Sequence, residues 1–378
     1  MNDTEIPQNY VSPRAYSWSS PLQRVGRVVI ATHAICPSLE RLQNGDLLTA
    51  LYSWTVWQGK MESAVKLTRS IDGGLTWDQP IIVAGPPEHK SAHSHWGMTQ
   101  LSNGTILLPF NSTGEQGGLC SWLTKSLDGG RSWKKALRIA PGGMGGDKAL
   151  ESTCCYGKIR ELEKGQVILP VWGMRNGRYV CGYFESSDFA ETWDGFVCVG
   201  NESFIGGDET DFIRIPDGPL LAVMRVASHE GHGMSPLYYC YSEDGRDWSD
   251  PEPAWNMYGH SPCLFVTKKG NLICGYRYVG DLDTGIVGVS FSHGRWHKSS
   301  RTMSWTFPNH MWLGSTWGMM AAWKINRCGY PSFAYVDSER ILCAYWMTWT
   351  IKSVGGMDTP VVYDNQAHDV EGVFWIEK

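Results

Sequence analysis

The sequence contains no apolar run approaching the ~18–20 residues that a membrane-spanning helix needs, so we expect no association with a membrane. It also has no excess of basic residues: 33 Lys and Arg stand against 38 Asp and Glu, and the formal charge of −5 argues against nucleic acid as a partner. The N-terminus MNDTEIPQNY lacks the positive and then apolar pattern of a signal sequence, which predicts a cytoplasmic protein.

Disulfide patterns and helical periodicity are lacking as well. The 11 cysteines include no CxxC pair and are odd in number, which predicts reduced, mostly buried thiols. No window shows sustained 3.6-residue amphipathicity, so we expect little helix. Glycine and tryptophan are abundant instead, with 43 and 19 copies, which indicates many turns and many large rings to pack.

An element of two apolar runs joined by a short turn recurs six times, at 37–51, 97–110, 157–172, 210–224, 262–276 and 331–346. Its turn glycines are Gly45, Gly104, Gly165, Gly218 and Gly270, and Glu339 takes the sixth place. Runs joined in this way are typical of β-hairpins. The sequence therefore predicts six hairpins at regular spacing.

A second element lies between the hairpins and reads SIDGGLTW (70–77), SLDGGRSW (126–133), SSDFAETW (186–193), SEDGRDW (242–248) and, degraded, SFSHGRW (290–296). In such a turn the Asp side chain accepts backbone N–H bonds and the Trp packs back between strands. Together the two elements give about four strands per unit, the period of propeller blades.

The fold expected is an all-β, six-bladed propeller forming one domain over 1–378, with an N-terminal arm at 1–25. Six inner hairpins but five Asp turns are reconciled if RVVIATH (27–33) pairs with EGVFWIEK (371–378) to complete the sixth blade. Aligning the hairpins places one residue from each unit near the axis, namely Cys36, His95, Tyr156, Glu209, Ser261 and Tyr330. Ionisable and aromatic residues crowded around one axis are a candidate site.

The Asp turns resemble the Asp boxes of the sialidase (neuraminidase) superfamily of glycosidases, over about residues 27–378. The resemblance implies a catalytic Glu followed past the turn by an Arg, which here are Glu209 and Arg225 in ETDFIRIPDGPLLAVMR. It also implies a nucleophilic Tyr opening the last blade, here Tyr330 in GYPSFAY, and Arg277 stands seven residues after its turn glycine as Arg225 does. Arg225 and Arg277 would bind an anionic group of the substrate.

The chemistry fits these residue types. The carboxylate on the reacting carbon of a sialic acid would repel an Asp or Glu nucleophile, whereas a neutral phenol avoids that repulsion. With a pKa near ~10, the phenol needs a base, and Glu209 beside Tyr330 would serve. Asp208 is a further candidate catalytic acid.

The sequence departs from the family at two places. Ile35-Cys36-Pro37 replaces the first Arg-Ile-Pro motif, and 54–70 contains Glu62 but no Asp to act as general acid. These departures argue against sialic acid itself while keeping the glycan class. The sequence is closer to a divergent sialidase-like branch with Gly-His-x-Pro and Gly-Tyr-Pro-Ser motifs, here GHSPCLF (259–265) and GYPSFAY (329–335).

Histidines and Tyr156 complete the candidate substrate-binding set. His93 and His95 open the second unit and His260 opens the fifth. An HxH pair on a strand dictates no third ligand, so we expect no metal and no cofactor.

Three function classes stay open. The first is a glycoside hydrolase acting on an acidic or decorated glycan. The second is a uronate-specific polysaccharide lyase, in which Tyr330 or a His would abstract the proton beside a carboxylate. The third is a non-catalytic glycan-binding propeller.

Overall fold

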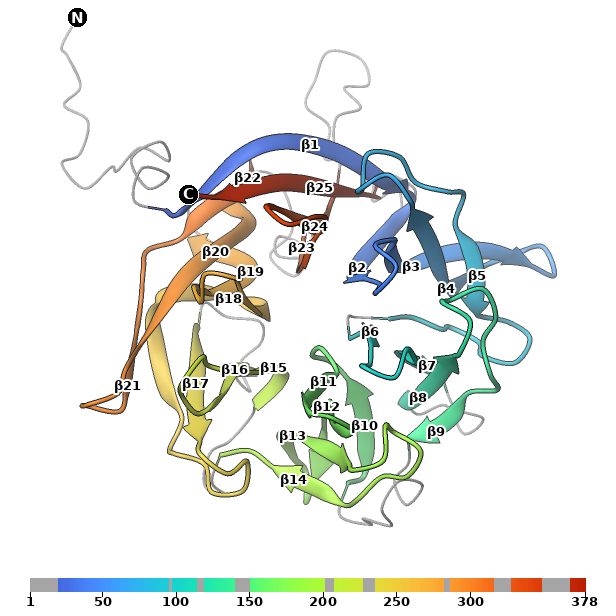
Figure 1. Ribbon diagram of the computed structural model, residues 1–378. Coiled ribbons are helices and arrows are strands. Elements are labelled where there is room, and N and C mark those ends of the chain that lie inside the picture. Colours follow the sequence, from blue (N-terminus) through green and yellow to red (C-terminus); the bar gives the residue numbers. More distant parts are fainter. Residues whose placement is uncertain are drawn as a thin grey trace, which may run out of the picture.

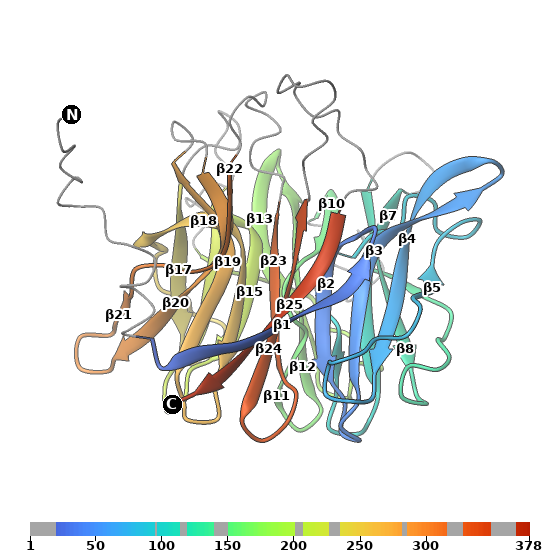
Figure 2. The ribbon, with the colours of Figure 1, turned by 90° about the horizontal axis from the view of Figure 1, so that it is seen from above.

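The protein is described by a computed structural model that covers residues 20–94, 97–113, 119–139, 150–200, 207–226, 235–281, 286–315, 328–348 and 368–378. The regular secondary structure in these ranges is β-strand throughout. Figure 1 shows the sheets arranged around a central axis, and Figure 2 shows the same ring turned by 90°. The expected all-β, propeller-like arrangement is confirmed. In the described ranges there is no helix of the length and apolarity needed to cross a bilayer.

Four sheets each correspond to one unit of the sequence. They are formed by β2 (Ala34–Arg41), β3 (Leu47–Trp57), β4 (Lys60–Ser70) and β5 (Ile81–Ala84); by β6 (Thr99–Gln100), β7 (Ile106–Thr113), β8 (Leu119–Ser126) and β9 (Leu137–Ile139); by β10 (Ser152–Cys155), β11 (Arg160–Glu163), β12 (Gln166–Arg175), β13 (Arg178–Ser186) and β14 (Phe196–Cys198); and by β23 (Cys328–Tyr335), β24 (Arg340–Thr348), β25 (His368–Glu377) and β1 (Leu22–Thr32).

The fourth and fifth units share one eight-stranded sheet. Its strands are β15 (Gly207–Arg214), β16 (Leu220–Val226), β17 (Pro236–Ser242), β18 (Glu252–Val266), β19 (Leu272–Asp281), β20 (Ile286–His297), β21 (Thr302–Trp305) and β22 (Asn309–Ser315). The 15-residue β18 pairs with β17 near its start and with β19 near its end. The described chain therefore forms five hydrogen-bonded sheets and not six separate ones, because one strand continues from unit to unit.

The hairpin turns repeat one hydrogen-bond pattern. In the first, Gly45 N donates to Leu42 O (2.9 Å) and Leu42 N donates to Asp46 O (2.8 Å). This turn needs a left-handed residue, and Gly45 has φ of 94°. In the fourth hairpin the left-handed residue is Asp217 (φ 54°) and not Gly218, the turn glycine that the alignment predicts.

Four of the Asp turns form as predicted. Asp72 Oδ1 accepts N–H bonds from Leu75 and Thr76 (both 3.0 Å), and its Oδ2 accepts the Thr76 hydroxyl (2.6 Å). Ser70 Oγ accepts the Gly74 N–H (2.9 Å). Side chains at Asp128, Asp188 and Asp244 accept backbone N–H bonds in the same way.

The prediction of a fifth Asp turn at 290–296 is wrong. These residues lie inside β20, which continues to His297 and pairs with β21 through Trp296 and Met303. The segment has Ser292 where the other copies have Asp, so it lacks the carboxylate that organises the turn. Its Trp296 still packs against Tyr241, with ring centroids 4.9 Å apart.

Strand β1 closes the ring, as predicted. It pairs antiparallel with β25 from Leu22 and Glu377 to Thr32 and Asp369, and in Figure 1 it lies on the outside of its sheet. The strand begins at Leu22, inside the stretch 1–25 that was expected to be an arm. The buried Glu371 of β25 is paired with Arg27 of β1.

Six apolar clusters of described residues form the core, and each lies between two neighbouring units. One packs Leu39 and Leu47 of the first unit against Leu342 and Phe374 of the sixth, for example. The others follow around the ring between successive units. All 11 cysteines are free, and ten of them are buried, which confirms the prediction of mostly buried thiols.

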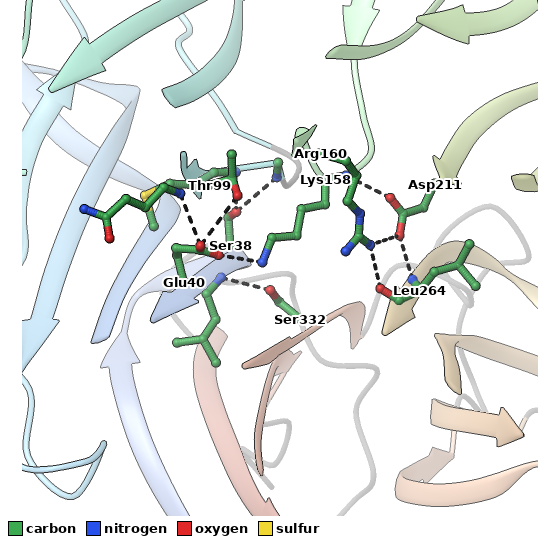
Figure 3. A network of polar contacts seen from close by, with 12 residues as sticks. Ser38, Glu40, Thr99, Lys158, Arg160, Asp211, Leu264 and Ser332 are labelled. Atoms are coloured by element: carbon green, nitrogen blue, oxygen red, sulfur yellow. Dashed lines mark hydrogen bonds and ion pairs between the residues drawn. The ribbon is translucent and has the colours of Figure 1, made fainter. Parts of the chain in front are cut away.

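Polar side chains near the axis tie the inner strands together (Figure 3). Ser332 Oγ of the sixth unit accepts the Leu39 N–H of the first (2.9 Å). Ser38 Oγ then accepts the N–H of Met98 in the second unit (2.8 Å). Neighbouring inner strands are therefore held at fixed relative heights.

The same network continues through the third, fourth and fifth units. The buried Asp211 accepts N–H bonds from Lys158 (2.9 Å) and Leu264 (2.6 Å) and pairs with Arg160 (3.1 Å). The Lys158 ammonium donates to Glu40 of the first unit (2.5 Å). A frame of this kind gives residues on the inner strands fixed positions around the axis.

Candidate active site

Four inner strands bulge at the equivalent position. The register shifts between Ile35 and Ser38 in β2, Gly207 and Thr210 in β15, His260 and Cys263 in β18, and Gly329 and Ser332 in β23. A bulge interrupts strand alternation and changes where a side chain points. Three residues that the alignment placed at the axis lie in these bulges with left-handed φ, each before a proline: Cys36 (51°), Ser261 (57°) and Tyr330 (51°).

Glu209 and Tyr330 meet although they are 121 residues apart in the chain. The Tyr330 hydroxyl donates to Glu209 Oε1 at 2.5 Å. Glu209 Oε2 accepts both the N–H and the hydroxyl of Ser261, each at 3.0 Å. Glu209 is 4 % exposed and Ser261 fully buried, so the carboxylate is held by three donors out of bulk water.

Arg225 reaches the same place but is bound to Asp208. Its Nε donates to Asp208 Oδ1 (2.8 Å) and its Nη2 to Oδ2 (2.5 Å), a two-point pair. Its Nη1 lies 3.2 Å from Glu209 Oε2. The Glu209 N–H also donates to Asp208 Oδ1 (2.6 Å). Asp208 is therefore fixed against Arg225, at the bulge between Gly207 and Thr210.

Arg277 lies against the ring of Tyr330, with its guanidinium carbon 5.2 Å from the ring centroid. It is 3 % exposed, and its Nε donates to the carbonyl of Cys328 (2.6 Å). A Cβ at Gly329 would lie 2.7 Å from Arg277 Nε, so the close packing of this arginine requires glycine there.

Charge partners set the protonation of the pair. Burial would raise the pKa of Glu209, but Arg225 and Arg277, with the hydrogen bond from Tyr330 and the nearby His260, outweigh it and lower the pKa to about 2. Burial, followed by the charge of Glu209, raises the pKa of Tyr330 well above its usual value. The resting pair is a carboxylate that accepts a hydrogen bond from a neutral phenol.

The remaining predicted residues divide into two groups. Tyr156 packs edge-on against Tyr330 (centroids 5.9 Å apart), and its hydroxyl donates to the Pro262 carbonyl (2.9 Å). His260 is 4 % exposed and acts electrostatically on Glu209. His93 instead donates from Nδ1 to the Ser91 carbonyl (2.9 Å) and packs on Tyr52, and burial lowers its pKa. His95 lies outside the described residues.

Sequence reasoning assigned no role to two residues that it places at the axis, Ser261 and Cys36. Ser261 was placed at the axis without a role, although its position before Pro262 in a bulged strand signals a special backbone. Cys36 is buried beside the pair, and burial raises the pKa of its thiol. Within the described ranges, His, Cys, Asp and Glu do not form a group of three that could hold a metal ion.

Solved structures with the same fold span most of the chain. A protein of unknown function from Dyadobacter fermentans is 18% identical, with a TM-score of 0.69, and the match covers 95% of this chain and 100% of that one. The Hadza microbial sialidase Hz136 is 16% identical with a TM-score of 0.61, covering 90% of this chain and 65% of the sialidase. The Penicillium chrysogenum α-L-arabinanase, complexed with arabinobiose, is 15% identical with a TM-score of 0.60, covering 93% and 98%.

The comparison with curated proteins finds no match. The profile of the BNR repeat-like domain family matches residues 45–311, well over half of the chain. The propeller-like ring, the repeated Asp turns and this match all indicate the same family. The chain belongs to the BNR repeat-like domain family, and its fold is that of the sialidase superfamily.

Proposed function

We propose that this protein is a glycoside hydrolase whose reacting pair is Glu209 and Tyr330, set at the axis of a propeller of six blades when the eight-stranded sheet is counted as two. The observation that carries the proposal is the 2.5 Å hydrogen bond from Tyr330 to Glu209 between two distant inner strands. The solved neighbours include proteins named as sialidases and an α-L-arabinanase, which supports a glycan as substrate.

In the proposed reaction the Tyr330 oxygen attacks the anomeric carbon while Glu209 takes the phenolic proton. The bond to the leaving sugar oxygen breaks, and a general acid protonates that oxygen. Water then attacks the anomeric carbon and gives its proton to the conjugate base of that acid, while the tyrosyl–glycosyl bond breaks and Glu209 returns the proton to Tyr330. Two successive displacements retain the configuration. Because the pKa of Glu209 is low and that of Tyr330 is high, the proton moves during attack and not before it.

Arg277 and Arg225 have different roles in this proposal. Arg277, packed on the Tyr330 ring, stabilises the negative charge that develops on the phenolic oxygen. Asp208 was a candidate acid, but its two-point pair with Arg225 favours a positioning role, in which it holds Arg225 against Glu209. His260, His93, His95 and Tyr156 remain candidate substrate contacts.

The test uses Glu209→Gln and Tyr330→Phe on a panel of aryl glycosides. We expect kcat to fall by about 10²–10⁴-fold in each variant, with little change in Tm. The matched controls are Glu371→Gln and Tyr345→Phe, which alter a second buried Tyr–Glu contact (3.4 Å) in the sixth unit and should keep activity. Retained turnover in both site variants would overturn the proposal.

The same panel separates the other two functions. A uronate lyase would release an unsaturated product that absorbs ultraviolet light, and a binding protein would retain ligand after Glu209→Gln without forming any product. A 2-deoxy-2-fluoro glycoside that traps the covalent intermediate should label the peptide that contains Tyr330. A label on Glu209 would keep the hydrolase and exchange the roles within the pair.

A further inference from the structure

The guanidinium group of Arg225 binds a carboxylate of the protein itself, that of Asp208, through two of its nitrogen atoms. The Nε and Nη2 edge that would grip a substrate carboxylate is filled by Asp208, at 2.8 and 2.5 Å. The remaining Nη1 lies 3.2 Å from Glu209. A planar guanidinium binds a carboxylate in two-point fashion through one such edge. A carboxylated sugar would therefore have to displace Asp208.

Displacement is opposed by the surroundings of Asp208. This carboxylate is 3 % exposed, and the Glu209 N–H donates to it as well as Arg225. If Arg225 turned to a substrate, Asp208 would be left as a buried carboxylate without its guanidinium partner, which is strongly unfavourable. The Asp208–Arg225 ion pair is thus a fixed part of the site, and Arg225 is not available to bind a substrate carboxylate.

Among the described residues, two guanidinium groups and two carboxylates lie together at this site. Arg225 and Arg277 act on Glu209, and Asp208 and Glu209 supply the two opposing carboxylates. A third carboxylate on the reacting carbon of a sugar would face Glu209 without an added guanidinium among these four groups. Two carboxylates brought close together in a buried site repel each other strongly.

We propose, resting on the hydrolase function above, that the natural substrate carries no carboxylate at its reacting carbon and is a neutral glycoside, with Asp208 occupying the position that a substrate carboxylate would take. A neutral sugar does not repel Glu209, so either oxygen of the pair can approach its anomeric carbon. Arg225 then serves to hold Glu209 in place and is not a specificity residue for acidic sugars.

The first experiment compares the wild-type protein on neutral pentosides and hexosides with sialosides and glucuronides, all as p-nitrophenyl or methylumbelliferyl derivatives. We expect kcat/KM on at least one neutral glycoside to exceed that on every carboxylated one by about 100-fold or more. A preference for a carboxylated glycoside overturns this inference and leaves the hydrolase standing.

The second experiment is independent of turnover and measures binding of N-acetylneuraminate and glucuronate by calorimetry. Asp208→Asn keeps the shape of the side chain and uncovers the charge of Arg225, so we expect these anions to bind at least about tenfold more tightly than to the wild type. The control is Asp211→Asn. Asp211 lies on the same strand as Asp208 but pairs with Arg160, so this variant should show no gain in anion affinity. Tm is recorded for both variants.

The two experiments separate the possible failures. If no glycoside is cleaved, the hydrolase proposal fails, and the anion measurements still decide whether Asp208 occupies the position that a substrate carboxylate would take. Weak binding to the wild type with a gain in Asp208→Asn supports it. Millimolar or tighter binding of either sugar acid to the wild type overturns it, as does Asp208→Asn failing to gain affinity while folded.

Discussion

Ser261 donates twice to one oxygen of Glu209, from its N–H and from its hydroxyl, while its backbone is left-handed at φ 57°. We predict that Ser261→Ala and Ser261→Gly both lower kcat by about tenfold with little change in KM, because each loses the hydroxyl donor. Glycine tolerates this φ, so Ser261→Gly should be more stable than Ser261→Ala by about 0.5–1 kcal/mol. Steady-state kinetics and urea unfolding measure the two effects. Unequal losses of kcat that track stability would contradict the assignment.

At the same scale, sequence reasoning named Glu209, Tyr330, Arg225 and Arg277 as candidate site residues through their resemblance to a known motif. It did not identify the partner of Arg225. Simple alternation along β15 directs Asp208 away from Glu209's neighbours, and the bulge between Gly207 and Thr210 cancels that alternation. This register shift depends on how β15 pairs with β16, and it cannot be predicted from the sequence pattern of β15 alone.

Among the structural elements, the Asp turns carry their own pH dependence. Hydrogen bonds from the Thr76 hydroxyl and N–H lower the pKa of Asp72 to about 2. The contribution of ionised Asp72 to the free energy of unfolding is fully present above the unfolded pKa of ~3.9 and is lost as the pH falls toward 2. We predict that Asp72→Ala lowers the free energy of unfolding by about 1 kcal/mol at pH 7 and Asp72→Asn by less. The difference between wild type and Asp72→Asn should shrink from pH 6 to pH 3 in urea unfolding. A constant difference would show that the charge is unimportant.

The elements also show where a motif is enough and where it is not. The Ser-x-Asp copies predicted their turns because the carboxylate that organises each turn is local in sequence. The copy at 290–296 kept the Gly and Trp but not the Asp, and the chain there runs on as strand β20. The turn in the fourth hairpin shifted to Asp217 for its left-handed residue, since Pro219 follows Gly218 and restricts it.

For the whole molecule, closure depends on one charged contact as well as on strand pairing. Arg27 of β1 is partly exposed, whereas its partner Glu371 is fully buried. We predict that Arg27→Met lowers the free energy of unfolding by about 2 kcal/mol, because it leaves a buried carboxylate without its guanidinium partner. The double variant Arg27→Met/Glu371→Gln should recover part of that loss in equilibrium urea unfolding. A double variant that is less stable than Arg27→Met alone would contradict this explanation.

At this scale the repeat period and the leftover strand sufficed to predict a ring closed by the N-terminal segment. They did not predict that β18 joins the fourth and fifth units into one sheet. That joining depends on a strand of 15 residues whose two ends pair with different neighbours, and strand length is set by tertiary pairing more than by local pattern.

The pairing of β1 with β25 also bears on how the protein is made. β1 is the first described strand to leave the ribosome and β25 is the last. At 5–20 residues per second, the stretch between them takes roughly 20–70 s to translate. Throughout that interval β1 lacks its native partner strand, and we expect nascent-chain chaperones to shield its edge until β25 has been synthesised.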